Sequence, residues 1–169
     1  MNSLTPLGIV HTAISLVALG AGIYALIRDR EVLPSNALGK VYIWATVLTC
    51  LTGFGIFQHG GFGKPHALGV LTLLVLAVAA LPGGTRFGAR WRYFTASCYT
   101  LTVFFHFIPG ITETFTRLPA GAPVFSSPED PRLEKVVGVV FIVFVAIIGL
   151  QVRRLRRTVG APGGLRSAA

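Results

Sequence analysis

Charged residues are scarce in this sequence of 169 residues, where they make up 12% of the chain. A soluble globular domain carries about a quarter, and the mean hydropathy of this chain, +0.70, is high as well. The scarcity is greatest inside several apolar runs, each long enough to cross roughly 30 Å of hydrocarbon at about 1.5 Å per residue. The composition excludes an ordinary soluble protein and predicts a polytopic membrane protein.

Cysteine is also rare, and the usual sequence motifs of catalysis are missing. The two cysteines, Cys50 and Cys98, lie within apolar runs and form neither a C-x-x-C pair nor a disulfide framework. The sequence contains no P-loop, no nucleophile elbow, no H-E-x-x-H motif and no paired carboxylates. These absences leave open whether the chain is an enzyme.

Acidic residues are few, six against 15 basic ones, and the net charge is +9. Such a balance is common among nucleic-acid-binding proteins. Here, however, the basic residues stand at the ends of the apolar runs rather than on a separate polar face. We therefore predict contact with the lipid bilayer and no nucleic-acid partner.

The apolar runs predict a single all-α domain over residues 1–152, a transmembrane helical bundle with five crossings. Asp130 and Pro131 precede the fifth run as a capping side chain and a proline at the first helical position. Residues 153–169 are predicted to form a basic cytoplasmic tail, disordered where glycine and proline follow Val159. The predicted helices span residues 4–27, 40–58, 66–82, 93–115 and 134–152.

The basic residues also predict the orientation of the bundle. Five crossings place eleven of them on one side and four on the other, which is a clear positive-inside bias. The N-terminus is thus expected outside and the C-terminus in the cytoplasm of a bacterial cytoplasmic (inner) membrane. The eleven are Arg28, Arg30, Lys40, Arg86, Arg90, Arg92, Arg153, Arg154, Arg156, Arg157 and Arg166, and the four are Lys64, Arg117, Arg132 and Lys135.

Aromatic residues near the inner ends of the runs match the belt expected at a membrane interface. They are Tyr24, Tyr42, Trp44 and Trp91. They need no catalytic explanation.

All four histidines fall in the predicted outer half of the membrane. His11 lies about seven residues into the first helix, roughly 10 Å deep, and His106 lies about nine residues before the outer end of the fourth, roughly 14 Å deep. Glu113 is the only acidic residue within an apolar run, and it lies in the same half.

Helical spacing indicates which way His11 and His106 face. The fourth helix carries one polar stripe, and the first carries one face of small or polar residues that favours close packing in lipid. Both histidines are therefore expected to point into the bundle. The stripe is Thr95, Thr102, His106, Gly110 and Glu113, and the face is His11, Ser15, Ala18 and Gly22.

An imidazole buried in hydrocarbon needs a hydrogen-bond partner or a ligand. One interpretation is a hydrogen bond to a serine, threonine, tyrosine or backbone carbonyl of a neighbouring helix. The other is a functional site, with His11 and His106 as axial ligands of a b-type haem or, with Glu113, as ligands of a divalent metal. His106 and Glu113 would also suit a quinone head group or a proton path, as exchangeable donors. His59 and His66, in "FQHGGFGKPHALG", are expected at headgroup level, on the rim of such a site.

These patterns leave three functional hypotheses. The leading one is a membrane protein that binds b-type haem or a metal, linked to electron or proton transfer. The first alternative is a non-enzymatic subunit or assembly factor that contacts a larger membrane complex through helix 134–152. The second is a small transporter of protons or metal ions, which the lack of an evident internal repeat makes less favoured.

Three stretches resemble an uncharacterised family of bacterial polytopic membrane proteins with four to five helices. They are His11 in the first helix, Leu38-Gly39-Lys40-Val41-Tyr42 at the start of the second, and Arg90-Trp91-Arg92-Tyr93 before the fourth. The resemblance covers about residues 8–110 and implies the same multi-pass fold. The family has a histidine shortly before the Leu-Gly pair, where this chain has Ser35-Asn36.

Overall fold

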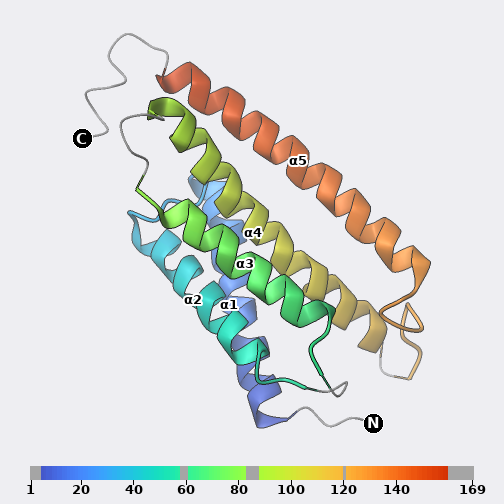
Figure 1. The fold of residues 1–169 in the computed structure, drawn as a ribbon. Coiled ribbons are helices and arrows are strands. Elements are labelled where there is room, and N and C mark those ends of the chain that lie inside the picture. The colour runs from blue at the N-terminus through green and yellow to red at the C-terminus, as the bar shows by residue number, and fades with distance from the viewer. Residues whose placement is uncertain (1–4, 58–60, 83–87, 120, 160–169) are drawn as a thin grey trace.

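The structure, a computed structural model, describes residues 5–57, 61–82, 88–119 and 121–159 of the chain. These residues contain five α-helices and no strand, which confirms the predicted all-α fold. The helices lie side by side in an elongated bundle (Figure 1). Their bounds are Pro6–Arg28 (α1), Ala37–Gly53 (α2), Lys64–Ala80 (α3), Gly88–Arg117 (α4) and Pro131–Val159 (α5).

Three helices are long and apolar enough to cross a membrane. They are α1, residues 90–117 of α4 and residues 131–158 of α5, with mean hydropathies of 1.9, 1.3 and 2.5. Helices α2 and α3 are apolar too, but each has 17 residues. Large apolar side chains such as Leu16, Trp44 and Ile142 are exposed on the bundle surface. A surface of this kind suits hydrocarbon rather than water.

The helix ends follow local capping chemistry more than hydropathy. Helix α2 begins three residues before the predicted start because the Asn36 side chain accepts the backbone N–H of Gly39 at 2.7 Å. The predicted cap of α5 is confirmed, since Asp130 Oδ1 accepts the backbone N–H of Arg132 at 2.9 Å. Helix α4 begins at Gly88, so it includes the polar residues that precede its apolar run.

Helix α5 extends seven residues beyond its predicted end at residue 152, as far as Val159. Residues 153–159 were expected in the tail, but they are helical. Arginine and leucine, which fill this stretch, are good helix formers, and Leu155 is buried. Residues 160–169, also part of the predicted tail, lie outside the described residues.

Helix α4 occupies the middle of the bundle, where it packs against α1, α3 and α5, while α2 packs against α1 and α3. The predicted small-residue face of α1 is used for close packing. A Cβ atom added at Gly22 would lie 2.9 Å from the Tyr42 ring and 3.0 Å from Val103. Ala18, one turn away, is fully buried. Small residues thus let α1, α2 and α4 meet closely.

Candidate functional site

Polar side chains form a stripe along α2. Tyr42, Thr46, Thr49 and Thr52 follow one another at spacings of four, three and three residues, which places them on one helical face. Tyr42 and Thr46 are fully buried. The stripe carries partners for side chains of both α1 and α4, so it lies where the three helices meet.

His106 of α4 forms a hydrogen bond with this stripe. Its Nε2 lies 3.0 Å from Oγ1 of Thr46, in the buried interior. The Thr46 hydroxyl donates its single proton to the carbonyl oxygen of Tyr42 at 2.8 Å. The threonine oxygen therefore accepts from His106, which carries its proton on Nε2 and has a lone pair on Nδ1.

His11 of α1 has the same kind of partner. Its Nδ1 lies 3.0 Å from Oγ1 of Thr52. The Thr52 hydroxyl donates to the carbonyl oxygens of Leu48 and Thr49, at 2.8 and 3.1 Å. His11 is therefore the donor through Nδ1, and the lone pair is on Nε2. The two histidines are opposite tautomers, each oriented by one threonine of α2.

Tyr42 supplies a second link between α2 and α4. Its hydroxyl lies 2.7 Å from Oγ1 of Thr102, which donates to the carbonyl oxygen of Tyr99. Tyr42 is thus the donor, and its ring also meets the His106 ring edge-on at 6.1 Å. The expectation that Tyr42 belongs to an interfacial belt is wrong: it is fully buried, whereas Tyr24 and Trp44 are exposed. Tyr42 lies on the inward face of α2, where its hydroxyl meets Thr102 of α4, and this position explains why it is buried.

We call His11, His106, Thr46 and Thr52 the histidine site. The two threonines are six residues apart on α2, which corresponds to an offset of about 9 Å along the helix axis. His106 is buried and His11 is half-buried. The two imidazoles thus share one helix as their support, at different levels.

Glu113 does not join the histidine site. Its carboxylate is exposed and forms an ion pair of 2.6 Å with Arg117 on the next turn of α4. Within the part of the chain that the structure describes, no three His, Cys, Asp or Glu side chains gather closely enough to hold a metal ion. Among the described residues, His11, His106 and Glu113 therefore do not form a ready three-ligand metal group.

Of the two predicted rim histidines, His66 opens α3 and His59 lies outside the described residues. His66 is buried between Phe57 and Phe62, with ring centroids 5.1 and 5.4 Å away. Its Nδ1 accepts the backbone N–H of Gly63 at 3.3 Å, and its Nε2 is buried with no hydrogen-bond partner among the described residues. His66 thus helps to cap the first turn of α3, next to the loop where the rim of the site is expected.

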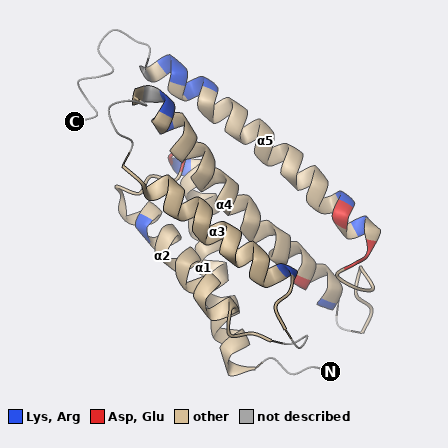
Figure 2. Ribbon diagram, in the orientation of Figure 1, with Lys and Arg blue, Asp and Glu red and all other residues tan. Residues whose placement is uncertain are grey.

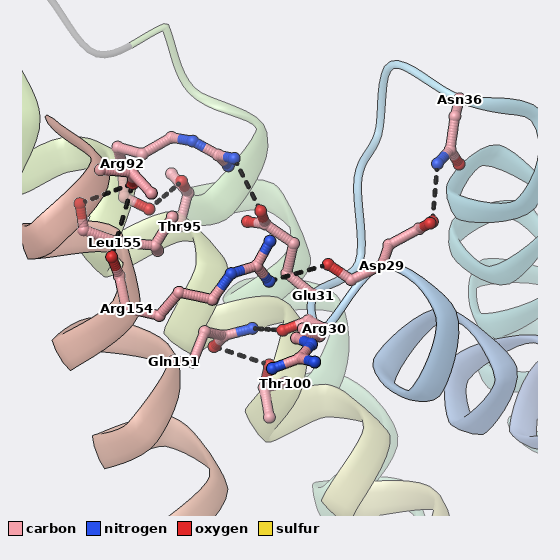
Figure 3. A network of polar contacts seen from close by, with 11 residues as sticks. Asp29, Arg30, Glu31, Asn36, Arg92, Thr95, Thr100, Gln151, Arg154 and Leu155 are labelled. Carbon is pink, nitrogen blue, oxygen red and sulfur yellow. Dashed lines mark hydrogen bonds and ion pairs between the residues drawn. The ribbon is translucent and has the colours of Figure 1, made fainter. Parts of the chain in front are cut away.

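A second polar cluster, which the sequence did not predict, lies at the other end of the bundle (Figure 3). There the segment that follows α1 rests against α4 and α5. Gln151 donates to the backbone oxygen of Arg30 at 3.0 Å and accepts from Thr100 at 3.0 Å, and Arg154 donates to the backbone oxygen of Asp29 at 3.1 Å. We call this cluster, together with Glu31 and Arg92, the basic-end clasp.

Charged pairs complete the basic-end clasp. Arg92 binds Glu31 at 2.9 Å; the carboxylate side chain is 6% exposed and the guanidinium side chain is 42% exposed. Oε2 of Glu31 is buried and has no hydrogen-bond partner in the described part of the chain. Nearby, two hydrogen bonds of 2.8 Å from Arg28 and one of 2.9 Å from Asn36 hold the pKa of Asp29 below its usual value.

Comparison with known proteins identifies no relative: no protein-family model, no curated protein and no solved structure matches this chain. The geometry alone defines the class, a helical bundle with three helices able to span a membrane and a threonine-supported histidine pair in its core.

Proposed function

We propose that this chain is a multi-pass protein of a bacterial cytoplasmic membrane, with five crossings, the N-terminus outside and the C-terminus in the cytoplasm. The charge distribution supports this orientation. Basic residues of α4 and α5 gather at one end of the bundle, while the opposite end carries a mixture of both signs (Figure 2). Helices α2 and α3, at 17 residues, are within the range of roughly 17–25 residues that crosses a bilayer.

We further propose that the histidine site binds a b-type haem or a divalent metal and takes part in electron or proton transfer. One observation carries this proposal: each imidazole is oriented through one ring nitrogen and keeps a lone pair on the other. Histidines that ligate metals are arranged in this way, because a second-shell acceptor fixes the tautomer and the ring orientation. Threonine hydroxyls of α2 have that role here.

Thr46 and Thr52 are offset by about 9 Å along the axis of α2, so the histidines that they bind lie at different levels. Imidazole nitrogens lie roughly 2 Å from a bound metal, so an ion shared by both histidines would lie between the two levels. His11 is the half-buried member of the pair and His106 the buried one. The proposal therefore assigns the fixed ligand to His106, supported by Thr46, and the adjustable ligand to His11.

Visible absorption of the purified protein, expressed with ample haem, tests the haem form of the proposal, and metal analysis tests the other. We expect a Soret band that His106→Ala abolishes. Thr46→Val should weaken haem or metal affinity roughly 10–100-fold, as the loss of a second-shell partner does. Thr52→Val should weaken it less, because His11 is the half-buried, adjustable ligand. A wild-type protein with no Soret band and no bound metal would overturn the proposal.

Thr49→Val is the matched control for these substitutions. Thr49 is a buried threonine on the same face of α2, and its hydroxyl donates to the carbonyl oxygen of Ala45. A loss of affinity in Thr49→Val equal to that in Thr46→Val would mean that the threonine face acts through packing and not through His106.

A second candidate function is that of a subunit or assembly factor in a larger membrane complex, which docks through α5. The supporting observation is that, among the described helices, α5 packs only against α4, and that just 11% of its most apolar 18-residue stretch is buried. Val139, Ile142 and Leu150 are exposed on it. Purification in a mild detergent tests this function, and a monodisperse monomer without a co-purifying protein would count against it.

A further inference from the structure

An apolar groove runs between α1 and α5. Both helices pack against α4 but not against each other, so a space of about 350 Å³ remains between them. Its walls include Ile23 and Ile27 of α1 and Val143 and Ile147 of α5, and Phe107 of α4 also lines it. Every side chain that lines the groove is a hydrocarbon, so its occupant must be hydrocarbon as well.

The groove reaches the basic-end clasp. Ile147 is four residues before Gln151 and seven before Arg154, which are on the same face of α5, one and two turns further along. Those two residues hold the backbone of Arg30 and Asp29, directly after α1 (Figure 3). The contact closes the groove at this end and leaves it open along the rest of its length.

The closed end is cationic. The guanidinium group of Arg154 is exposed there, two helical turns beyond Ile147 on the same face of α5. Arg154 uses one N–H on the carbonyl oxygen of Asp29, which leaves further donors of its planar fork for a ligand. The two carboxylates of the described loop are already bound, that of Asp29 by Arg28 and Asn36 and that of Glu31 by Arg92.

The groove is about two thirds as long as one leaflet of a bilayer is thick. The lining residues of α5 extend from Val140 to Ile147, which is about 10 Å along a helix, compared with roughly 15 Å for half of the hydrocarbon core. In the proposed orientation the closed, cationic end lies at the cytoplasmic surface. A hydrocarbon chain that continues from the groove past Ile147 would place its polar head beside Arg154.

We propose that the groove between α1 and α5 holds one acyl chain of an anionic phospholipid of the cytoplasmic leaflet, whose phosphate is bound by Arg154. This inference rests on the proposed membrane orientation, but it requires neither haem nor metal. Arginine suits this role because its fork binds phosphate oxygens in pairs.

Native mass spectrometry of the purified full-length protein in detergent tests the proposal, with added phosphatidylglycerol or phosphatidylcholine of equal chain length as probes. We expect the wild-type protein to retain phosphatidylglycerol roughly tenfold better, which corresponds to about one charge-assisted hydrogen bond. Arg154→Gln should remove this preference. Ile147→Trp, which fills the groove, should lower the retention of both lipids.

Ile142→Trp is the matched control, because Ile142 is 68% exposed on α5 and does not line the groove. If Ile147→Trp does not fold, Ile27→Trp fills the groove from the opposite wall at an exposed position. Equal retention of the two lipids by the wild type, or equal retention by the groove-filling and control variants, would overturn the proposal. The absorption spectrum of the same samples reports on the histidine site separately, so the two proposals can fail independently.

Discussion

The histidine site and the basic-end clasp both hold helices together, but they use different kinds of interaction. In both, polar groups join helices that are distant in the sequence. The histidine site uses neutral hydrogen bonds in which each hydroxyl donates to its own helix and accepts from a histidine. The clasp uses charges and backbone oxygens. Charge is costly in hydrocarbon and tolerable at an interface, so the contrast agrees with the proposed depth of each region.

The largest effect is expected from breaking the clasp with Arg92→Ala. This change leaves the buried carboxylate of Glu31 without its partner. Loss of one partner of a fully buried pair costs about 3–5 kcal/mol, but Arg92 is partly exposed and water will compensate. We expect the free energy of unfolding in mixed micelles to fall by about 2 kcal/mol.

The double variant Glu31→Gln/Arg92→Ala checks the cause of that loss. If the uncompensated charge is responsible, adding Glu31→Gln should restore more than half of the stability lost in Arg92→Ala. A double variant as unstable as Arg92→Ala alone would show that Arg92 acts by packing.

A smaller loss is expected from Thr46→Val in the histidine site. The valine keeps the shape of the threonine but leaves the buried Nε2–H of His106 without an acceptor. We expect a loss of about 1–2 kcal/mol in the free energy of unfolding. Thr49→Val serves as the comparison, and if it were equally destabilising, the hydrogen bond to His106 would not be the cause.

Thr52→Val should cost less, about 0.5 kcal/mol, because His11 and Thr52 are only half-buried and Nδ1 can find another partner. The same unfolding measurement checks the order of the two variants. If Thr52→Val were the more destabilising variant, the hydrogen bond between His11 and Thr52, and not the one between His106 and Thr46, would contribute more to holding the helices together.

The smallest expected effect is on the stability of the protein at acidic pH. Because Arg28 lowers the pKa of Asp29 in the folded protein, the Asp29 carboxylate stabilises the fold above the unfolded value of about 3.9. That contribution is lost as the pH falls through the lowered folded pKa. Stability measured from pH 6 downwards should therefore decline less steeply in Asp29→Asn than in the wild type. Identical slopes would exclude Asp29 as a contributor.

The fold was more predictable than the site because its signals are local. The apolar runs and the Asp130-Pro131 cap of α5 are contiguous stretches of sequence, and both agree with the structure. The burial of His106 and Thr102 also followed from their spacing on α4.

The partners of the histidines were not identified, although the spacing of Tyr42, Thr46, Thr49 and Thr52 would have indicated one polar face of α2. Threonines are common in apolar helices, where they bond to their own backbone, so this signal is weak. The basic-end clasp could not be predicted, for another reason. Gln151 and Arg30 are 121 residues apart, and no local pattern specifies that contact.

The tautomers of His106 and His11 provide the most direct test of the account, because the proposed site depends on which ring nitrogen is free. Long-range ¹⁵N–¹H correlation spectra of the ¹⁵N-histidine-labelled protein in micelles, assigned with single His→Gln variants, report them. We predict neutral rings, with the proton on Nε2 of His106 and on Nδ1 of His11. Spectra that show the same tautomer for both histidines, or a charged ring at neutral pH, would contradict the threonine-supported site.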